Sequence, residues 1–194
     1  MKKQPTFRPF NLILLLLASF SLWYCQSTGQ LNNETIPMNQ EIISHEGEPI
    51  LVGQLNREAW QMEAYQDWFA AEYADYTVDE ATVAGLQPHI GNLEVKVFLG
   101  TWCSDSQREV PHLYKVLDAL DFDETHLQVV ALDNHPDRRK TSPQHEEAGW
   151  NIEYVPTIIF LRNGTEIGRI VEMPEVSLER DLAVILAREA GLML

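Results

Sequence analysis

One junction constrains the fold of this chain more than any other feature. An apolar run, residues 93–99, is followed within four residues by Trp102 and Cys103, and an amphipathic pattern then covers residues 104–120. The run predicts a buried strand and the pattern predicts a helix, so the cysteine stands between them. Backbone N–H groups and the helix dipole stabilise an anion at such a position. The sequence therefore predicts that Cys103 acts as a nucleophile.

The position three residues after this cysteine holds Ser106 instead of a second cysteine. A hydroxyl can hydrogen-bond a thiolate at Cys103, but it cannot displace a sulfur from a mixed disulfide. Asp105 beside the cysteine opposes thiolate formation, because like charges repel. The other cysteine of the chain, Cys25, lies near the N-terminus. The motif thus indicates a site with one active thiol.

Residues 1–25 have the order of an export signal, with a basic start and an apolar run over 10–24. That run is shorter than the roughly 20 residues that a spanning helix needs. A lipoprotein-type signal would place Cys25 at the first mature position, where lipid consumes its thiol. Ordinary cleavage after Ser19-Phe20-Ser21, a site with small residues at its first and third positions, and an uncleaved anchor are the alternatives. We expect an extracytoplasmic protein, located in the periplasm, with a lipid anchor on Cys25 as the leading arrangement.

Charge and histidine spacing restrict the partners. The chain has 14 Lys and Arg against 29 Asp and Glu, a net charge of −15. Such a field repels phosphate backbones and anionic membrane surfaces, so we expect no nucleic-acid partner and membrane contact only through the lipid. The 6 histidines are scattered, so no metal site and no cofactor are expected. A copper or zinc site that combines Cys103 with His135 or His145 is the alternative.

Residues 26–47 are polar and lack periodicity, which predicts a flexible tether before a domain spanning 48–194. Within the domain, a strand is expected near 49–52, and Asn56 is a plausible N-cap for a helix that runs to about Asp75. The other expected elements are a short helix capped by Asp79, strands at 127–132, 157–162 and 166–171, a short structured segment near 146–150, and a last helix capped by Ser177. The Asn163-Gly164 pair predicts a tight hairpin.

This order of elements resembles the thioredoxin-like fold over residues 90–190. The matching motifs are Trp102-Cys103, Pro111 eight residues after the cysteine, Asp133-Asn134-His135-Pro136, Val155-Pro156-Thr157, and Arg162-Asn163-Gly164. The resemblance implies an α/β fold with a central mixed β-sheet flanked by helices. The N-terminal part would be a helical elaboration of that fold.

The resemblance also implies roles for residues around the thiol. Cys103 would attack a disulfide, with Ser106 at the place of the family's resolving cysteine. A cis bond before Pro156 would turn the Val155 backbone toward the cysteine, where an extended substrate could pair with it. Trp102 would form an apolar wall beside the thiol. Together with Trp102, the substrate-binding residues would be Val155, Pro156 and Thr157.

The leading functional hypothesis is an exported protein with one active thiol. Cys103 would form mixed disulfides with extracytoplasmic protein thiols, disulfides or sulfenic acids, and a small-molecule thiol would release them. The family's buried acid, six residues before the cysteine, is replaced by Val97. That replacement agrees with the absence of a resolving thiol, because the acid assists resolution. The alternative is a non-catalytic binding module that uses the cis-proline groove, with Cys103 as a packing residue.

Overall fold

The computed structural model describes residues 1–3 and 37–192, so residues 4–25 of the expected signal, Cys25 included, and residues 26–36 of the expected tether lie outside the described residues. Six strands form one mixed sheet in the order β1-β2-β4-β3-β5-β6. The strands are β1 (Gln40–Ile43), β2 (Pro49–Leu55), β3 (Leu93–Leu99), β4 (Leu127–Ala131), β5 (Thr157–Arg162) and β6 (Thr165–Val171). The α-helices are α1 (Gln66–Asp75), α2 (Glu80–Leu86), α3 (Ser104–Ala119) and α4 (Leu178–Glu189). Short 3-10 helices cover Arg57–Gln61, Gln87–His89, Glu124–His126 and Pro136–Arg138.

The connections define a thioredoxin-like fold. Strands β3 and β4 are parallel and joined through α3, whereas every other pair of neighbouring strands is antiparallel. The hairpin β5–β6 leads to α4, which contacts β6. The fold class predicted from the sequence is therefore confirmed: a central mixed sheet flanked by helices, with α1 and α2 as the helical N-terminal elaboration.

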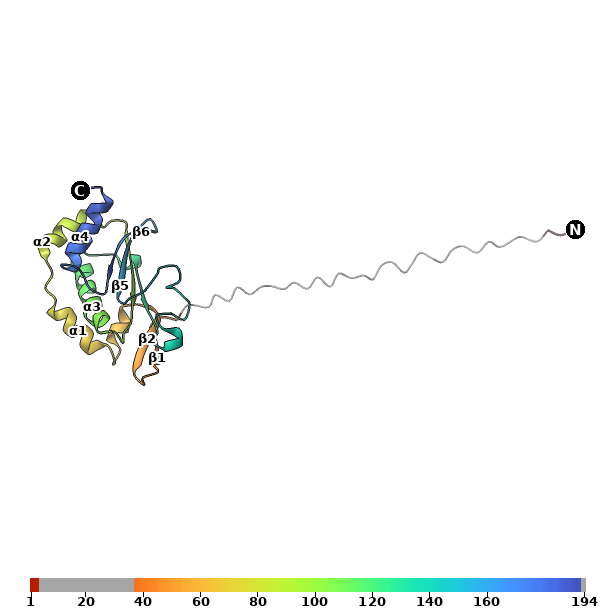
Figure 1. The fold of residues 1–194 in the computed structure, drawn as a ribbon. Helices are drawn as coiled ribbons and strands as arrows, with labels where there is room; N and C mark the ends of the chain where they lie inside the picture. Colours follow the sequence, from red (N-terminus) through yellow and green to blue (C-terminus); the bar gives the residue numbers. More distant parts are fainter. Residues whose placement is uncertain (4–36, 193–194) are drawn as a thin grey trace. The chain divides into compact units, whose positions relative to one another are not determined.

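The two faces of the sheet are covered differently. Helices α1 to α4 lie on one side of it in Figure 1, and contacts join α1 to α3 and α2 to α4. Because neighbouring residues of a strand point to opposite faces, Val97 and Leu99 face this helical layer within the larger hydrophobic core. Phe98 and Ile159 belong to a smaller cluster on the other face. The partly buried side chains packed against that smaller cluster come from loops.

The end of the expected tether is wrong, because Gln40–Ile43 forms strand β1 and pairs with β2. A tight turn explains the pairing. The hydroxyl of Ser44 accepts from the N–H groups of Glu46 and Glu48, and Gly47 has φ +93°, which glycine adopts without strain. Residues 40–48, most of which are polar, therefore form a hairpin that shows no hydrophobic periodicity.

The expected single helix from Asn56 to Asp75 is also wrong. Asn56 does cap a helix, since its side chain accepts from the N–H of Glu58, but that helix is the short 3-10 turn. Trp60 and Tyr65 are both buried, at 4% and 2% exposure. Residues five apart on one α-helix point about 140° away from each other, so the break before α1 lets both rings reach one core. Trp60 then stacks on Phe69 with 4.9 Å between ring centroids.

Turns, and no helix, occupy the segment near 146–150 where a short structured segment was expected. The buried hydroxyl of Ser142 bonds the carboxylates of Glu146 and Glu147 and closes these turns. Across the described residues, the structure contains no helix with the length and apolarity required to span a bilayer.

Candidate thiol site

Cys103 lies where the sequence predicted it, between β3 and α3, as the N-cap residue of the helix. Its N–H donates to the carbonyl of Gly100, and its carbonyl accepts from the N–H of Gln107, both at 2.9 Å. The side chain is half-buried, and Sγ donates to the carbonyl oxygen of Val155 at 3.3 Å. The thiol is therefore held between the start of α3 and the loop before β5 while part of it remains accessible.

Ser106 is completely buried, and its hydroxyl accepts from the N–H of Gly100 at 3.2 Å. The sequence had suggested a hydrogen bond from this hydroxyl to the sulfur of Cys103. The structure gives Ser106 a different partner, because the backbone that turns out of β3 presents an N–H group to the first turn of α3. Ser106 thus fixes the loop that carries the cysteine.

Trp102, for which the resemblance implies an apolar wall, lies directly before Cys103 and packs beside it. Its indole N–H donates to the carbonyl of Leu132 at 2.8 Å, and its ring packs with Cys103 on the smaller hydrophobic cluster. The ring lies directly over Gly100, where an added Cβ would come within 2.5 Å of it. Gly100 is therefore required for this close approach, a role that the sequence analysis did not assign.

The loop before β5 forms the opposite side of the site. The peptide bond between Val155 and Pro156 is cis. The Pro156 carbonyl accepts from the N–H of Glu172 at 2.7 Å, and the hydroxyl of Thr157 donates to the carbonyl of Tyr154, also at 2.7 Å. Thr157 is 1% exposed and the Val155 side chain is also buried, so the loop offers mainly its backbone to the site. Substrate binding by Val155, Pro156 and Thr157 stays a prediction.

The charges beside the thiol are largely paired. Asp105 forms an ion pair with Arg108 at 3.0 Å, and Arg108 also bonds Glu109 at 2.7 Å. Burial tends to raise the pKa of Glu109, but hydrogen bonds from His112 and Arg108 outweigh it and leave that pKa lowered. At the position of the family's buried acid, Val97 is completely buried in the larger core.

Two basic side chains from the loop after β4 reach the site, which the sequence analysis did not foresee. The guanidinium carbon of Arg139 lies 5.7 Å from the centroid of the Trp102 ring. The ammonium group of Lys140 lies 5.0 Å from the centroid of the Tyr154 ring. Both distances are within the range of cation–π contacts. The Arg138-Arg139-Lys140 run was the available signal, but its sequence does not reveal where the loop folds.

Within the described part of the chain, no group of three or more His, Cys, Asp or Glu side chains is placed to hold a metal ion. His135 instead packs edge-to-face with His45, with 5.7 Å between ring centroids. His145 pairs with Glu147 at 3.3 Å. The copper or zinc alternative built on Cys103 with either histidine has no support in this arrangement.

Comparisons with known proteins return structures but no sequence relatives: no protein-family model and no curated protein matches the chain. A crystal structure of a protein of unknown function from Pseudomonas aeruginosa, PA1234, aligns with 16% identity and a TM-score of 0.35, over 68% of this chain and 100% of that one. Oxidised mitochondrial thioredoxin 3 from Saccharomyces cerevisiae aligns with 22% identity and a TM-score of 0.31, over 62% and 96%. The fold assignment stands on the strand order and connections described above.

Proposed function

We propose that this protein is an exported thioredoxin-like protein whose single active thiol, Cys103, forms mixed disulfides in thiol–disulfide exchange. The observation that carries the proposal is the position of the sulfur. It is half-buried at the first residue before α3, and it donates to the backbone of the loop that bears the cis proline. A thiol used only for packing needs neither partial exposure nor this backbone partner.

In the proposed reaction, the Cys103 thiol first loses its proton to solvent. The thiolate then attacks one sulfur of a disulfide, the old S–S bond breaks, and the leaving sulfur departs with the bonding electron pair and takes up a proton. Because Ser106 has no thiol, an external small thiol must attack the mixed disulfide and release the product. The buried Val97 supplies no acid or base for an internal resolution step.

The proposal is tested by exposing the reduced full-chain protein to a small disulfide and following the products by mass spectrometry. We expect one mixed disulfide on Cys103 that persists until a small thiol is added, and no adduct on that site in C103S. S106C should shorten the lifetime of the adduct, because the position is one helical turn from the cysteine.

In cells, quenching with an alkylating agent should preserve reductant-sensitive complexes that C103S abolishes. A C103S protein that keeps all its partners would make the protein a binding module that uses the cis-proline groove. Absence of any adduct on Cys103 in the folded protein would contradict thiol exchange itself.

The proposed location is the periplasm, with residues 1–25 as the export signal and a lipid on Cys25. The mature protein should then partition into detergent, and C25S should release or mislocalise it. A mature N-terminus at Leu22, found by mass spectrometry, would contradict the lipid anchor. It would leave Cys25 as a thiol available to pair with Cys103.

A further inference from the structure

The loop after β4 brings two cations to the borders of the thiol. Arg139 lies against the ring of Trp102, the residue directly before Cys103. Lys140 lies over the ring of Tyr154, and its ammonium group donates to the carbonyl of Glu153. Tyr154 in turn precedes Val155, whose carbonyl accepts from the thiol. Each of the two segments that enclose the sulfur is therefore in contact with one cation from the loop after β4.

The same loop directs its other charges elsewhere. Arg138 is paired with the buried carboxylate of Asp133 at 3.0 Å. Asp137 and Arg138 line a cavity beside the hairpin β1–β2, together with residues of that hairpin such as Ile42. Asp137 also lies 3.9 Å from the ring of His135. The carboxylate of Asp137 is thus next to His135, whereas Arg139 is the charge of this loop that meets Trp102.

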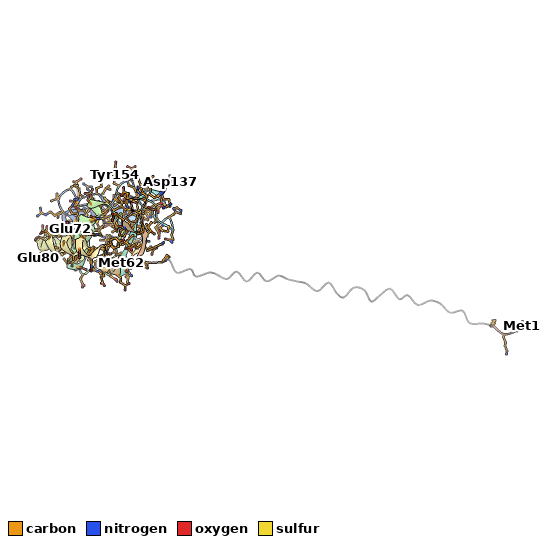
Figure 2. The ribbon with its side chains drawn as sticks, turned by 90° about the horizontal axis from the view of Figure 1, so that it is seen from below. Met1, Met62, Glu72, Glu80, Asp137 and Tyr154 are labelled. Carbon is orange, nitrogen blue, oxygen red and sulfur yellow. The ribbon has the colours of Figure 1, made fainter. Side chains whose placement is uncertain are left out.

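The two segments that enclose the thiol are in contact with cations that have no ion-pair partner among the described residues. Asp105 is neutralised by Arg108, whereas Arg139 is exposed and forms no ion pair with any carboxylate that the structure describes. Glu153 is the exposed acid of the facing segment, and Lys140 meets its backbone carbonyl. In Figure 2, Tyr154 and Asp137 are drawn toward the same side of the domain, away from Glu80 of α2.

We infer that the disulfide or thiol which exchanges with Cys103 is a small molecule that carries carboxylates, recognised by Arg139 and Lys140. This inference rests on the proposed function. The chain has a net charge of −15, so its overall field repels anions. Two cations on the segments that enclose the Cys103 sulfur offset that repulsion at the site, and they would hold a carboxylate of the substrate while its disulfide meets Cys103.

The exchange keeps its electron balance with such a substrate. The Cys103 thiolate attacks one sulfur of the carboxylate-bearing disulfide, a new S–S bond forms, and the other half leaves as a thiol after taking up a proton. A different small thiol then attacks the adduct at the sulfur of the bound group, the S–S bond to Cys103 breaks, and a mixed disulfide of the two small molecules leaves while Cys103 takes up a proton. The carboxylate-bearing disulfide is the oxidant in the first step, and the incoming thiol is the reductant in the second.

Three small disulfides of different charge test the inference. They are 3,3′-dithiodipropionate, which is anionic, bis(2-hydroxyethyl) disulfide, which is neutral, and cystamine, which is cationic. Rates of adduct formation are measured by mass spectrometry on the reduced full-chain protein and on the double variant R139Q/K140Q. Each rate is divided by the rate with the neutral disulfide, which removes any general change in the reactivity of the thiol.

In the double variant, the normalised rate with dithiodipropionate should fall about tenfold, because one charge at about 7 Å in water changes a rate about threefold. The normalised rate with cystamine should rise. R139K, which keeps the charge, should resemble the wild type, and salt at about 0.5 M should reduce all these differences. R188Q is the control for net charge, because it removes one positive charge, half of the change in the double variant, at an exposed position on α4 in the helical layer.

The outcomes separate this inference from the proposed function. If Cys103 reacts with none of the three disulfides, the proposed function fails. If it reacts with all of them and R139Q/K140Q leaves the normalised rates unchanged, charge recognition is overturned and thiol exchange stands. An equal shift per removed charge in R188Q would also overturn charge recognition, because the effect would then come from net charge alone.

Discussion

The two faces of the sheet differ in what covers them: helices on one face and loops on the other. The face under helices α1 to α4 is built from side chains at regular spacing and holds the larger hydrophobic core. The opposite face carries a smaller cluster, and loop residues that include Trp102 and Cys103 cover it. Regular elements close one face, whereas individual contacts such as the bond from Trp102 to Leu132 close the other.

This difference in how the two faces are covered suggests that one face mainly provides stability and the other mainly holds the reactive thiol. A core closed by helices gains free energy from buried apolar area, roughly 25 cal/mol per Å². A face closed by loops can leave a thiol partly exposed and can bring residues from several segments to it. We therefore expect changes on the helical face to alter the free energy of unfolding, and changes on the loop face to alter the reactivity of Cys103.

The strongest test uses two neighbouring residues of β5 that point to opposite faces. Phe160 is 1% exposed in the larger core, and Ile159 is completely buried in the smaller cluster. F160A should lower the free energy of unfolding by about 3–5 kcal/mol and I159A by about 2–5 kcal/mol, because each leaves a cavity. Urea denaturation measures both losses.

Only I159A should change the alkylation rate of Cys103 in the folded protein, since Cys103 packs against the smaller cluster that contains Ile159. F160A should leave that rate within about twofold, as distant sites act independently. A reversed pattern, with F160A changing the thiol rate and I159A leaving it unchanged, would break the division between the two faces.

Most of the helical face could be predicted from the sequence. The apolar run of β3 and the spacing in α3 and α4 set their bounds to within a residue or two, because burial on one face leaves a clear period. The failures have a tertiary cause. Nothing in the pattern around Met62 shows that Trp60 and Tyr65 share one core, and this packing is what breaks the helix.

On the face of the sheet that loops cover, the sequence predicted only the residues that belong to a motif. The motifs brought Trp102, Cys103 and Val155 together correctly, and the structure joins the last two by a hydrogen bond. The positions of Arg139 and the Ser106 hydroxyl were not predictable. They depend on backbone paths, such as the bond from the N–H of Lys140 to the carbonyl of Asp133, that leave no period in the sequence.

A smaller effect on the loop face is expected from G100A. The added Cβ would lie 2.5 Å from the Trp102 ring, so the ring must move and its bond to Leu132 must weaken. We expect a loss of about 1–3 kcal/mol and a changed alkylation rate for Cys103. The indole N–H resonance of Trp102 in an NMR spectrum reports the movement.

The matched control is G91A, because an added Cβ at Gly91 meets no atom within 4 Å. It should change stability by no more than about 0.5 kcal/mol. An unchanged Trp102 resonance in G100A would show that the ring does not depend on the glycine.

The smallest effect concerns an acid in the helical layer. Glu179 is 1% exposed and accepts from the Tyr76 hydroxyl at 2.6 Å and the Asp79 N–H at 2.7 Å. Burial tends to raise the pKa of Glu179, but these hydrogen bonds outweigh it and leave that pKa below its ordinary value. A lowered pKa in the folded state means that the carboxylate adds stability above the unfolded value of about 4.3. That contribution is lost as the pH falls through the folded-state pKa.

E179Q should therefore be less stable than the wild type by about 1 kcal/mol at pH 7, because one donor loses its acceptor. The difference should shrink as the pH falls below about 4, since the glutamine does not titrate. Urea denaturation at a series of pH values measures it, and the alkylation rate of Cys103 at pH 7 should stay at the wild-type value. A difference that is constant from neutral to acid pH would mean that the loss comes from packing, and a changed thiol rate would show that the helical layer reaches the thiol site.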